Sequence, residues 1–188
     1  MKSLLAAALL AAFGTAQAQT VTYAIDPTHT FATFEVQHLG TSTIRVRFDK
    51  KEGSIQFDRT GKSGRAEITI DMSSVNSGVA PFDGHLKSKD LFDVATYPTA
   101  KFVGDKFGFA GDKVTEIGGT LTFMGKTQPV TLKATNFNCY MSPMLKREVC
   151  GGDFETTIAR SQFGLNYGLP AFAPDNVRVT VQVEAVRQ

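Results

Sequence analysis

The chain has 188 residues, with 20 lysines and arginines against 18 aspartates and glutamates. This near-neutral balance, with both signs interspersed, excludes the basic stripe that a nucleic-acid-binding surface requires. After residue 18 no segment approaches the roughly 20 apolar residues needed to cross a bilayer, so we expect no membrane span.

The first 18 residues have the pattern of a secretory signal peptide. Lys2 supplies the positive charge, Leu4 to Phe13 form an apolar run, and Ala16-Gln17-Ala18 resembles a cleavage site with small residues. The apolar run is about half as long as a membrane span requires. We therefore predict a signal peptide at residues 1–18, export to the periplasm, and a single domain over residues 19–188.

Most of the remaining chain alternates between apolar and polar residues, which is the pattern of half-buried strands. Between residues 30 and 38, for example, Ala32, Phe34 and Val36 share one parity, and polar residues occupy the other. Gly53, residues 58–61 and Gly125-Lys126 provide turns. The ranges that we predict as strands are 21–25, 30–38, 43–48, 55–57, 65–71, 101–103, 107–109, 114–124, 128–134, 154–160 and 177–184.

Residues 81–96 interrupt this alternation. Pro81 stands where a helix could begin, and Ser88 could cap a second short turn. Tyr97-Pro98 then returns the backbone to an extended conformation. We predict a short helical insert at about residues 81–96 that covers an edge or an open end of the sheet.

These elements predict an all-β fold. About ten short strands with hairpin spacing are typical of an antiparallel barrel or a sandwich. The absence of tryptophan and the presence of fifteen phenylalanines favour a barrel with a hollow, apolar interior.

Cys139 and Cys150 are the only cysteines, and we predict that they form a disulfide. They are close in sequence, and the chain is predicted to enter an oxidising compartment. A redox pair or metal thiolates would need a CxxC spacing or a nearby histidine, and neither is present.

Four segments resemble motifs of the YceI-like proteins, in that family's order and over nearly the whole mature chain. They are TYAIDPTHTFATFEVQHLG at Thr22–Gly40, DGHLKSKDLFDVATYPTAKF at Asp83–Phe102, IGGTLTFMGKTQPVTL at Ile117–Leu132 and ARSQFGLN at Ala159–Asn166. The resemblance implies an extended, lipocalin-like antiparallel barrel, usually periplasmic. It also implies that the barrel carries a polyisoprenoid or a similar amphiphile, such as a quinone or a fatty acid, without a cofactor.

The predicted cavity residues share the apolar parity of a strand or belong to the helical insert. They are Phe34, Val36, Phe57, Ile68, Ile70, Phe82, Leu86, Phe92, Leu121, Phe123, Ile158 and Phe163, and the Val179–Val183 face is predicted to point inward with them. The insert could act as a lid over a ligand or as a plug, through Phe82, Leu86, Leu91 and Phe92.

His38 and Arg160 each follow an apolar face on the same parity, so we predict that they contact a ligand head group. A phosphate, a quinone oxygen or a carboxylate would suit them. The alternatives are that each makes a structural hydrogen bond or ion pair, or that a bulge turns it outward.

Two other functions are open at this stage. Asp83, His85 and Asp90 could hold a metal for hydrolysis, but no nucleophile turn or zinc spacing accompanies them. We therefore predict no catalytic residue and no metal, and expect His85 to anchor the helical insert to a loop. A stress-related or partner-binding module with a filled barrel is the other alternative. The sequence leaves the oligomeric state open between a monomer and a homodimer.

Overall fold

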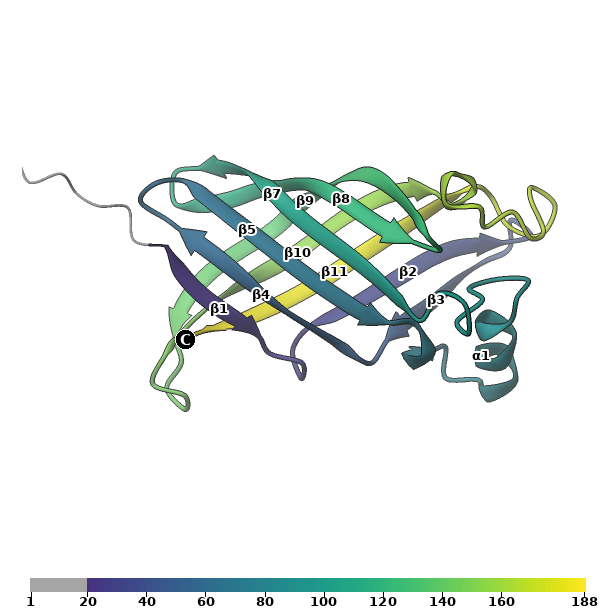
Figure 1. Cartoon of the computed structure of the whole chain (residues 1–188), viewed down its shortest axis with the longest axis horizontal. Helices are drawn as coiled ribbons and strands as arrows, with labels where there is room; N and C mark the ends of the chain where they lie inside the picture. The colour runs from purple at the N-terminus through teal and green to yellow at the C-terminus, as the bar shows by residue number, and fades with distance from the viewer. Residues whose placement is uncertain (1–19) are drawn as a thin grey trace, which may run out of the picture.

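A computed structural model of the chain describes residues 20–188 (Figure 1). The predicted signal peptide therefore lies outside the described residues. The strands are β1 (Val21–Ile25), β2 (Phe31–His38), β3 (Ser42–Phe48), β4 (Lys51–Asp58), β5 (Ser63–Asp71), β6 (Val75–Asn76), β7 (Thr99–Ala110), β8 (Lys113–Phe123), β9 (Lys126–Met141), β10 (Glu148–Ala159) and β11 (Asn176–Arg187). The helical elements are α1 (Ala80–Lys87) and the 3-10 turns η1 (Met72–Ser74) and η2 (Arg160–Phe163).

Eight strands close into an antiparallel barrel in the order β1-β4-β5-β7-β8-β9-β10-β11. The ring closes at β1, where Tyr23 pairs with Ile55 of β4 on one side and with Arg187 of β11 on the other. The strands cross the long axis obliquely, as closure of a barrel requires (Figure 1). The prediction of an all-β antiparallel barrel is confirmed, and the sandwich alternative is wrong.

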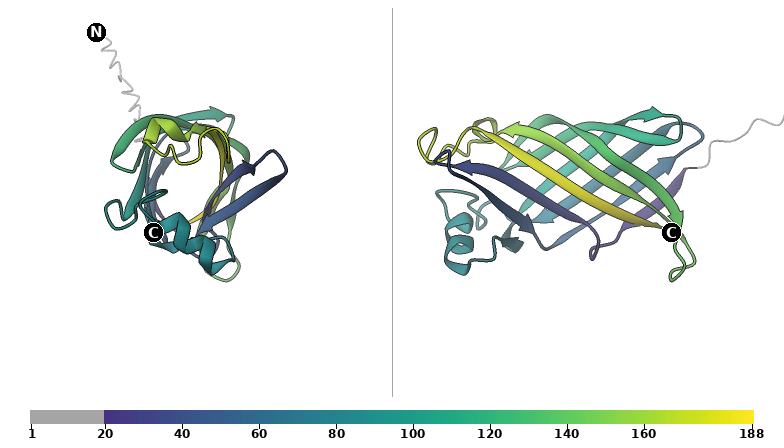
Figure 2. Two further views of the ribbon diagram at one scale, coloured as in Figure 1. Left: turned by 90° about the vertical axis from the view of Figure 1, so that its right-hand side faces the viewer. Right: turned by 180° about the vertical axis from the view of Figure 1, so that it is seen from behind.

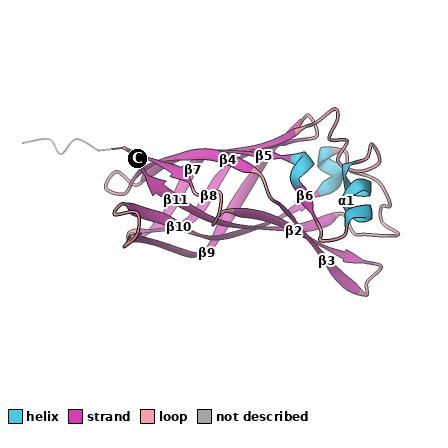
Figure 3. Ribbon diagram, turned by 90° about the horizontal axis from the view of Figure 1, so that it is seen from below, coloured by secondary structure: helices cyan, strands magenta, loops and turns pink. Residues whose placement is uncertain are grey.

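Strand β11 pairs along one edge with two different strands. Its last residues pair with β1, whereas residues 178–182 pair with β2, which continues to β3 and then to β6. The β2–β3 hairpin diverges from the barrel at the end where α1 lies (Figures 2 and 3). We call this end, with α1, the β2–β3 turn and residues 164–175, the mouth, and the opposite end the closed end.

The barrel has two separate cores. The core near the mouth consists of Val46, Phe48, Met72, Val75, Leu86, Phe92, Ala100, Phe123, Phe163 and Leu165. The core at the closed end consists of Tyr23, Ile25, Phe57, Val114, Ile117, Cys150, Phe154 and Ala185.

Aromatic rings fill the closed end. Phe57 is the centre of this group, with ring centroids of Tyr23, Phe107, Phe109 and Phe137 at 6.3, 6.2, 6.1 and 5.9 Å. Edge-on and offset ring contacts at such distances stabilise the fold by more than the burial of their apolar area alone would. The closed end is therefore a packed core.

The helical insert is shorter than predicted. Helix α1 begins with Pro81 in its first turn and ends at Lys87, because Ser88 adopts an extended conformation and its Oγ donates to His85 O at 2.7 Å. The rest of the predicted helix consists of turns, in which Ser88 O accepts from Leu91 N at 3.1 Å.

Three turn predictions differ from the structure. Gly53 is not in a turn, because it lies inside β4 and pairs with Ile68 of β5. Residues 101–103 and 107–109 belong to one strand, β7, and the predicted break at Gly104-Asp105 is a β-bulge opposite β8. The turn between β8 and β9 is centred on Met124 and Gly125, whose φ angles are 48° and 71°. A tight hairpin needs positive φ at both central residues, which places the turn one residue earlier than predicted.

Replacing Phe57 with alanine should lower the free energy of unfolding by about 3–5 kcal/mol, because it removes the central ring of the closed-end core and leaves a cavity. Urea unfolding of the two proteins measures this loss. The same substitution at Phe172, which is 55% exposed, should change stability by less than about 0.5 kcal/mol. Equal effects at both positions would contradict the assignment of the closed end as a packed core.

Candidate functional site

A cavity of about 430 Å³ lies inside the mouth of the barrel. Its walls come from strands on opposite sides of the barrel, from α1 and the turns after it, and from residues 164–175. Most of the predicted cavity residues line it, namely Phe34, Val36, Ile70, Phe82, Leu86, Phe92, Leu121, Phe123 and Ile158. Val179 of the last strand also lines it.

Three predicted cavity residues lie elsewhere. Phe57 belongs to the closed-end core, and Ile68 packs against that core. Phe163 is buried beside Phe123, with ring centroids 5.6 Å apart, and does not line the cavity. Alternation identifies the inward face of a strand, but it carries no information on the position along the barrel axis.

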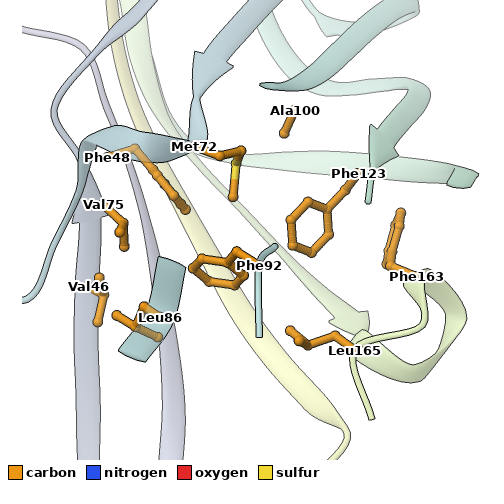
Figure 4. Close-up of a cluster of buried hydrophobic side chains, with 10 residues drawn as sticks. All are labelled: Val46, Phe48, Met72, Val75, Leu86, Phe92, Ala100, Phe123, Phe163 and Leu165. Carbon is orange, nitrogen blue, oxygen red and sulfur yellow. The ribbon is translucent and has the colours of Figure 1, made fainter. Parts of the chain in front are cut away.

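Phe92 occupies the centre of the mouth core (Figure 4). Its ring lies 5.7 Å from Phe34, 6.0 Å from Phe48 and 5.7 Å from Phe123, measured between centroids. The backbone holds it there, because Phe92 N donates to Leu86 O at 3.0 Å. The segment after α1 therefore fills part of the barrel and leaves the cavity beside it, so it is neither a complete plug nor only a lid.

The cavity has few polar side chains, and several of them are near its opening. His38, predicted to end a buried face, lies at the end of β2, where it is exposed and also lines the cavity. His85 of α1 also lines it and packs edge-on against Tyr167, with ring centroids 5.4 Å apart. This contact joins α1 to residues 164–175, which confirms the expected anchoring role of His85.

Arg160 is only 5% exposed and binds the backbone of the loop that follows it. Its Nε donates to Pro174 O at 3.0 Å, Nη1 to Leu165 O at 3.1 Å and to Tyr167 O at 2.8 Å, and Nη2 to Ala173 O at 3.1 Å. Burial lowers the pKa of the guanidinium from its usual value. Arg160 therefore makes structural hydrogen bonds, as one of the two alternatives predicted. Its contact with a head group stays a prediction.

Asp175 holds the other end of this loop. Its carboxylate accepts from Ser161 N at 2.8 Å and from Ser161 Oγ at 2.7 Å, and these hydrogen bonds keep the pKa of Asp175 below its usual value. Arg160 and Asp175 together fix an irregular segment that has no strand partner.

Several cavity residues were missed in the sequence. Leu165, Tyr167 and Phe172 lie in the loop, where no periodicity indicates which side chains point inward. Phe48 also lines the cavity, and its parity with Ile44 and Val46 was a usable signal.

Asp83, His85 and Asp90 do not converge on one point. The Asp83 carboxylate accepts from Ser77 N at 2.7 Å and from Ser77 Oγ at 2.6 Å, which lowers its pKa. His85 faces the cavity, and Asp90 is exposed in a turn. The Asp83 carboxylate thus supports the local fold.

Cys139 and Cys150 face each other on β9 and β10 and form the predicted disulfide. Among residues 20–188, they and Glu148 form the only group of three or more histidine, cysteine and carboxylate side chains close enough to share a metal ion. Because both sulfurs are joined to each other, this group offers no thiolate ligand.

The chain matches known proteins over nearly its whole length. A family model described as YceI-like domain matches residues 23–185. A UPF0312 protein of Pseudomonas aeruginosa is 35% identical over 191 residues, which cover 100% of this chain and 98% of that protein. A UPF0312 protein of Pseudomonas putida is 34% identical over 176 residues, or 92% of this chain and 90% of that one.

Two solved structures have a similar fold. BcnA of Burkholderia cenocepacia aligns with a TM-score of 0.71 and 23% identity, over 85% of this chain and 98% of that one. A polyisoprenoid binding domain from Saccharophagus degradans aligns with a TM-score of 0.65 and 20% identity, over 89% and 99%. Within the part of the chain that the structure describes, no helix has the length and apolarity that a membrane crossing requires.

Replacing Arg160 with methionine should lower the free energy of unfolding by at least about 3 kcal/mol, because several buried carbonyls of residues 164–175 lose their donor. Urea unfolding measures the loss. Arg178→Met is the matched control, since Arg178 pairs with Glu35 and Glu155 on the exposed surface, where such pairs contribute about 0–1 kcal/mol. A loss below about 1 kcal/mol for Arg160→Met would show that water replaces the guanidinium.

Proposed function

The chain belongs to the YceI-like family, and we propose that it binds a polyisoprenoid or a similar amphiphile in its barrel and carries it in the periplasm. The observation that carries this proposal is the apolar cavity of about 430 Å³ at one end of a closed barrel. Pockets for small molecules have volumes of roughly 300–1,000 Å³. The cavity therefore has the size of a ligand site.

The walls of the cavity suit a hydrocarbon tail. They consist mainly of phenylalanine and aliphatic side chains, which offer a tail no hydrogen bonds and need none in return. Each buried methylene contributes roughly 0.8 kcal/mol, so a tail binds without any catalytic group. Affinity then comes from burial of the tail.

The two ends of the cavity differ in a way that favours one orientation of the ligand. Toward the closed end the barrel is filled by the aromatic rings around Phe57. Near the mouth the polar residues His38, His85, Arg160 and Tyr167 line the cavity. In the proposed complex the tail points inward and the head group stays at the mouth.

A relative supports the ligand class, and the sequence supports the compartment. The Saccharophagus degradans domain is described as polyisoprenoid binding, and we extend that class of ligand to this chain. The predicted signal peptide at residues 1–18 supports export. A disulfide between Cys139 and Cys150 is suited to an oxidising compartment such as the periplasm.

The other functions receive less support. A metal-dependent hydrolase would use Asp83, whose carboxylate is engaged by Ser77. A module with a completely filled barrel would leave no room at the mouth, where the cavity lies.

Ala32→Phe should weaken binding at least about tenfold, because Ala32 lines the cavity and a phenyl ring there takes the space of the tail. Displacement of a fluorescent fatty acid by geranylgeraniol measures the affinity of the purified full chain. Ala110→Phe is the matched control, since Ala110 is exposed at the end of β7 and should bind as the wild type does. The melting temperature of each variant shows that it is folded.

Mass spectrometry of an organic extract of the freshly purified protein identifies a co-purified ligand. A wild-type protein that carries no lipid and binds neither isoprenoid nor fatty acid would contradict the proposed function.

A further inference from the structure

The mouth carries four exposed apolar side chains, two of which also line the cavity. Leu39, Val79, Tyr167 and Phe172 are 58%, 55%, 46% and 55% exposed. They come from three separate segments, namely the β2–β3 turn, the residue that precedes α1, and residues 164–175. We call these four residues the rim.

The three segments are joined to one another at the mouth. Leu39 N donates to Phe172 O at 3.0 Å, which ties the β2–β3 turn to the loop. The ring contact of His85 with Tyr167 ties the same loop to α1, whose N-cap is Val79. Figures 1 and 2 show the three segments at the same end of the barrel. The rim is therefore one feature of the surface.

Leu39 combines exposure with a backbone conformation that is unusual for a large apolar residue. Its φ angle is 51°, in the left-handed region that side chains other than glycine and asparagine seldom adopt. A glycine or an asparagine would form this turn with less strain. The chain instead places a large apolar side chain at an exposed, strained position, which is typical of a surface that contacts something else.

The rim is continuous with the cavity. Tyr167 and Phe172 are exposed and also line the cavity wall. An apolar path therefore leads from the inner wall to the outer surface. A hydrocarbon chain that followed this path would not have to cross water if the rim were seated in hydrocarbon.

We propose that the rim docks on the surface of a lipid bilayer and that the ligand passes between the bilayer and the cavity while the barrel is docked. The transfer of a ligand during docking rests on the proposed function, but the docking itself can be tested without any ligand. A bilayer is the partner that fits, because two of the four rim residues, Tyr167 and Phe172, also line the cavity from which a lipid would pass. Tyrosine and leucine are side chains that insert into the interfacial region of membranes.

The chain has a second group of exposed apolar side chains that serves as an internal control. Met141 and Met144, at the β9–β10 turn, are 67% and 87% exposed. This turn is at the closed end, and its residues do not line the cavity (Figure 1). Both methionines are more exposed than any rim residue, and neither lines the cavity.

The test compares the variant Leu39→Ser/Val79→Ser with the control Met141→Ser/Met144→Ser, both in the full mature chain. Neither Leu39 nor Val79 lines the cavity, so the rim variant keeps the ligand site intact. Flotation with vesicles of phosphatidylcholine, with and without phosphatidylglycerol, measures docking. We expect the wild type and the control to float with the vesicles, and the rim variant to partition at least about tenfold less.

A second measurement follows transfer of a fluorescent fatty acid from these vesicles to the protein. If docking precedes transfer, the rate rises with vesicle concentration for the wild type and the control. For the rim variant the rate should fall at least about tenfold, while its equilibrium affinity for the fatty acid in solution stays unchanged.

The outcomes separate the docking proposal from the proposed function. Absence of fatty-acid and isoprenoid binding in the wild type would contradict the proposed function, whereas flotation that depends on the rim would still support docking. Equal flotation of rim variant and wild type, or loss of flotation in the control alone, would overturn docking. Docking would also be overturned if the wild type were a dimer that does not bind vesicles and the rim variant were a monomer. That result would assign the rim to the contact with a second copy of the chain.

Discussion

The pairing of one edge of β11 with two strands determines how the two ends of the molecule differ. Near the C-terminus this edge pairs with β1, and the ring closes completely. Farther along, residues 178–182 pair with β2, which belongs to a hairpin that diverges from the barrel. Because backbone donors and acceptors need partners, a wall that diverges leaves an end that other segments must cover. Helix α1 and residues 164–175 meet this need, and the cavity lies beneath them.

The chain uses phenylalanine in two ways that follow from this asymmetry. At the closed end the strands themselves supply rings from several directions, so the space around Phe57 is filled. At the mouth a comparable ring, Phe92, comes from a turn after α1, and it fills only part of the space. The loop that completes the mouth has carbonyl groups without strand partners, and the guanidinium of Arg160 supplies several of the missing donors. A planar cation with donors in fixed directions is well suited to hold irregular backbone.

The sequence was sufficient to predict the class of fold and the inward faces, but not the position of the cavity. Phe34 and Phe57 have the same local pattern, since alternation with period 2 identifies a face and contains nothing about depth along the axis. Only the register between strands separates them, and register depends on pairings far apart in the chain. Tyr167 and Phe172 lie in a loop without periodicity, so their place at the mouth could not be predicted. The sequence leaves the role of Arg160 open for a related reason. Parity predicts that it points inward, but its partners are carbonyls of a loop whose path the sequence does not reveal.

Because the barrel is packed at its closed end, a long-chain ligand could enter and leave the cavity only at the mouth. In the proposed complex the tail would have to leave through the mouth, and exposing each methylene to water costs about 0.8 kcal/mol. A tail of ten methylenes would then meet a barrier of roughly 8 kcal/mol from hydration alone, which slows release by on the order of a million-fold. A barrel that binds a tail well in isolation would therefore release it poorly into water. An apolar rim in contact with a bilayer lowers this barrier, because each methylene passes from one apolar environment to another, so strong binding and rapid exchange become compatible.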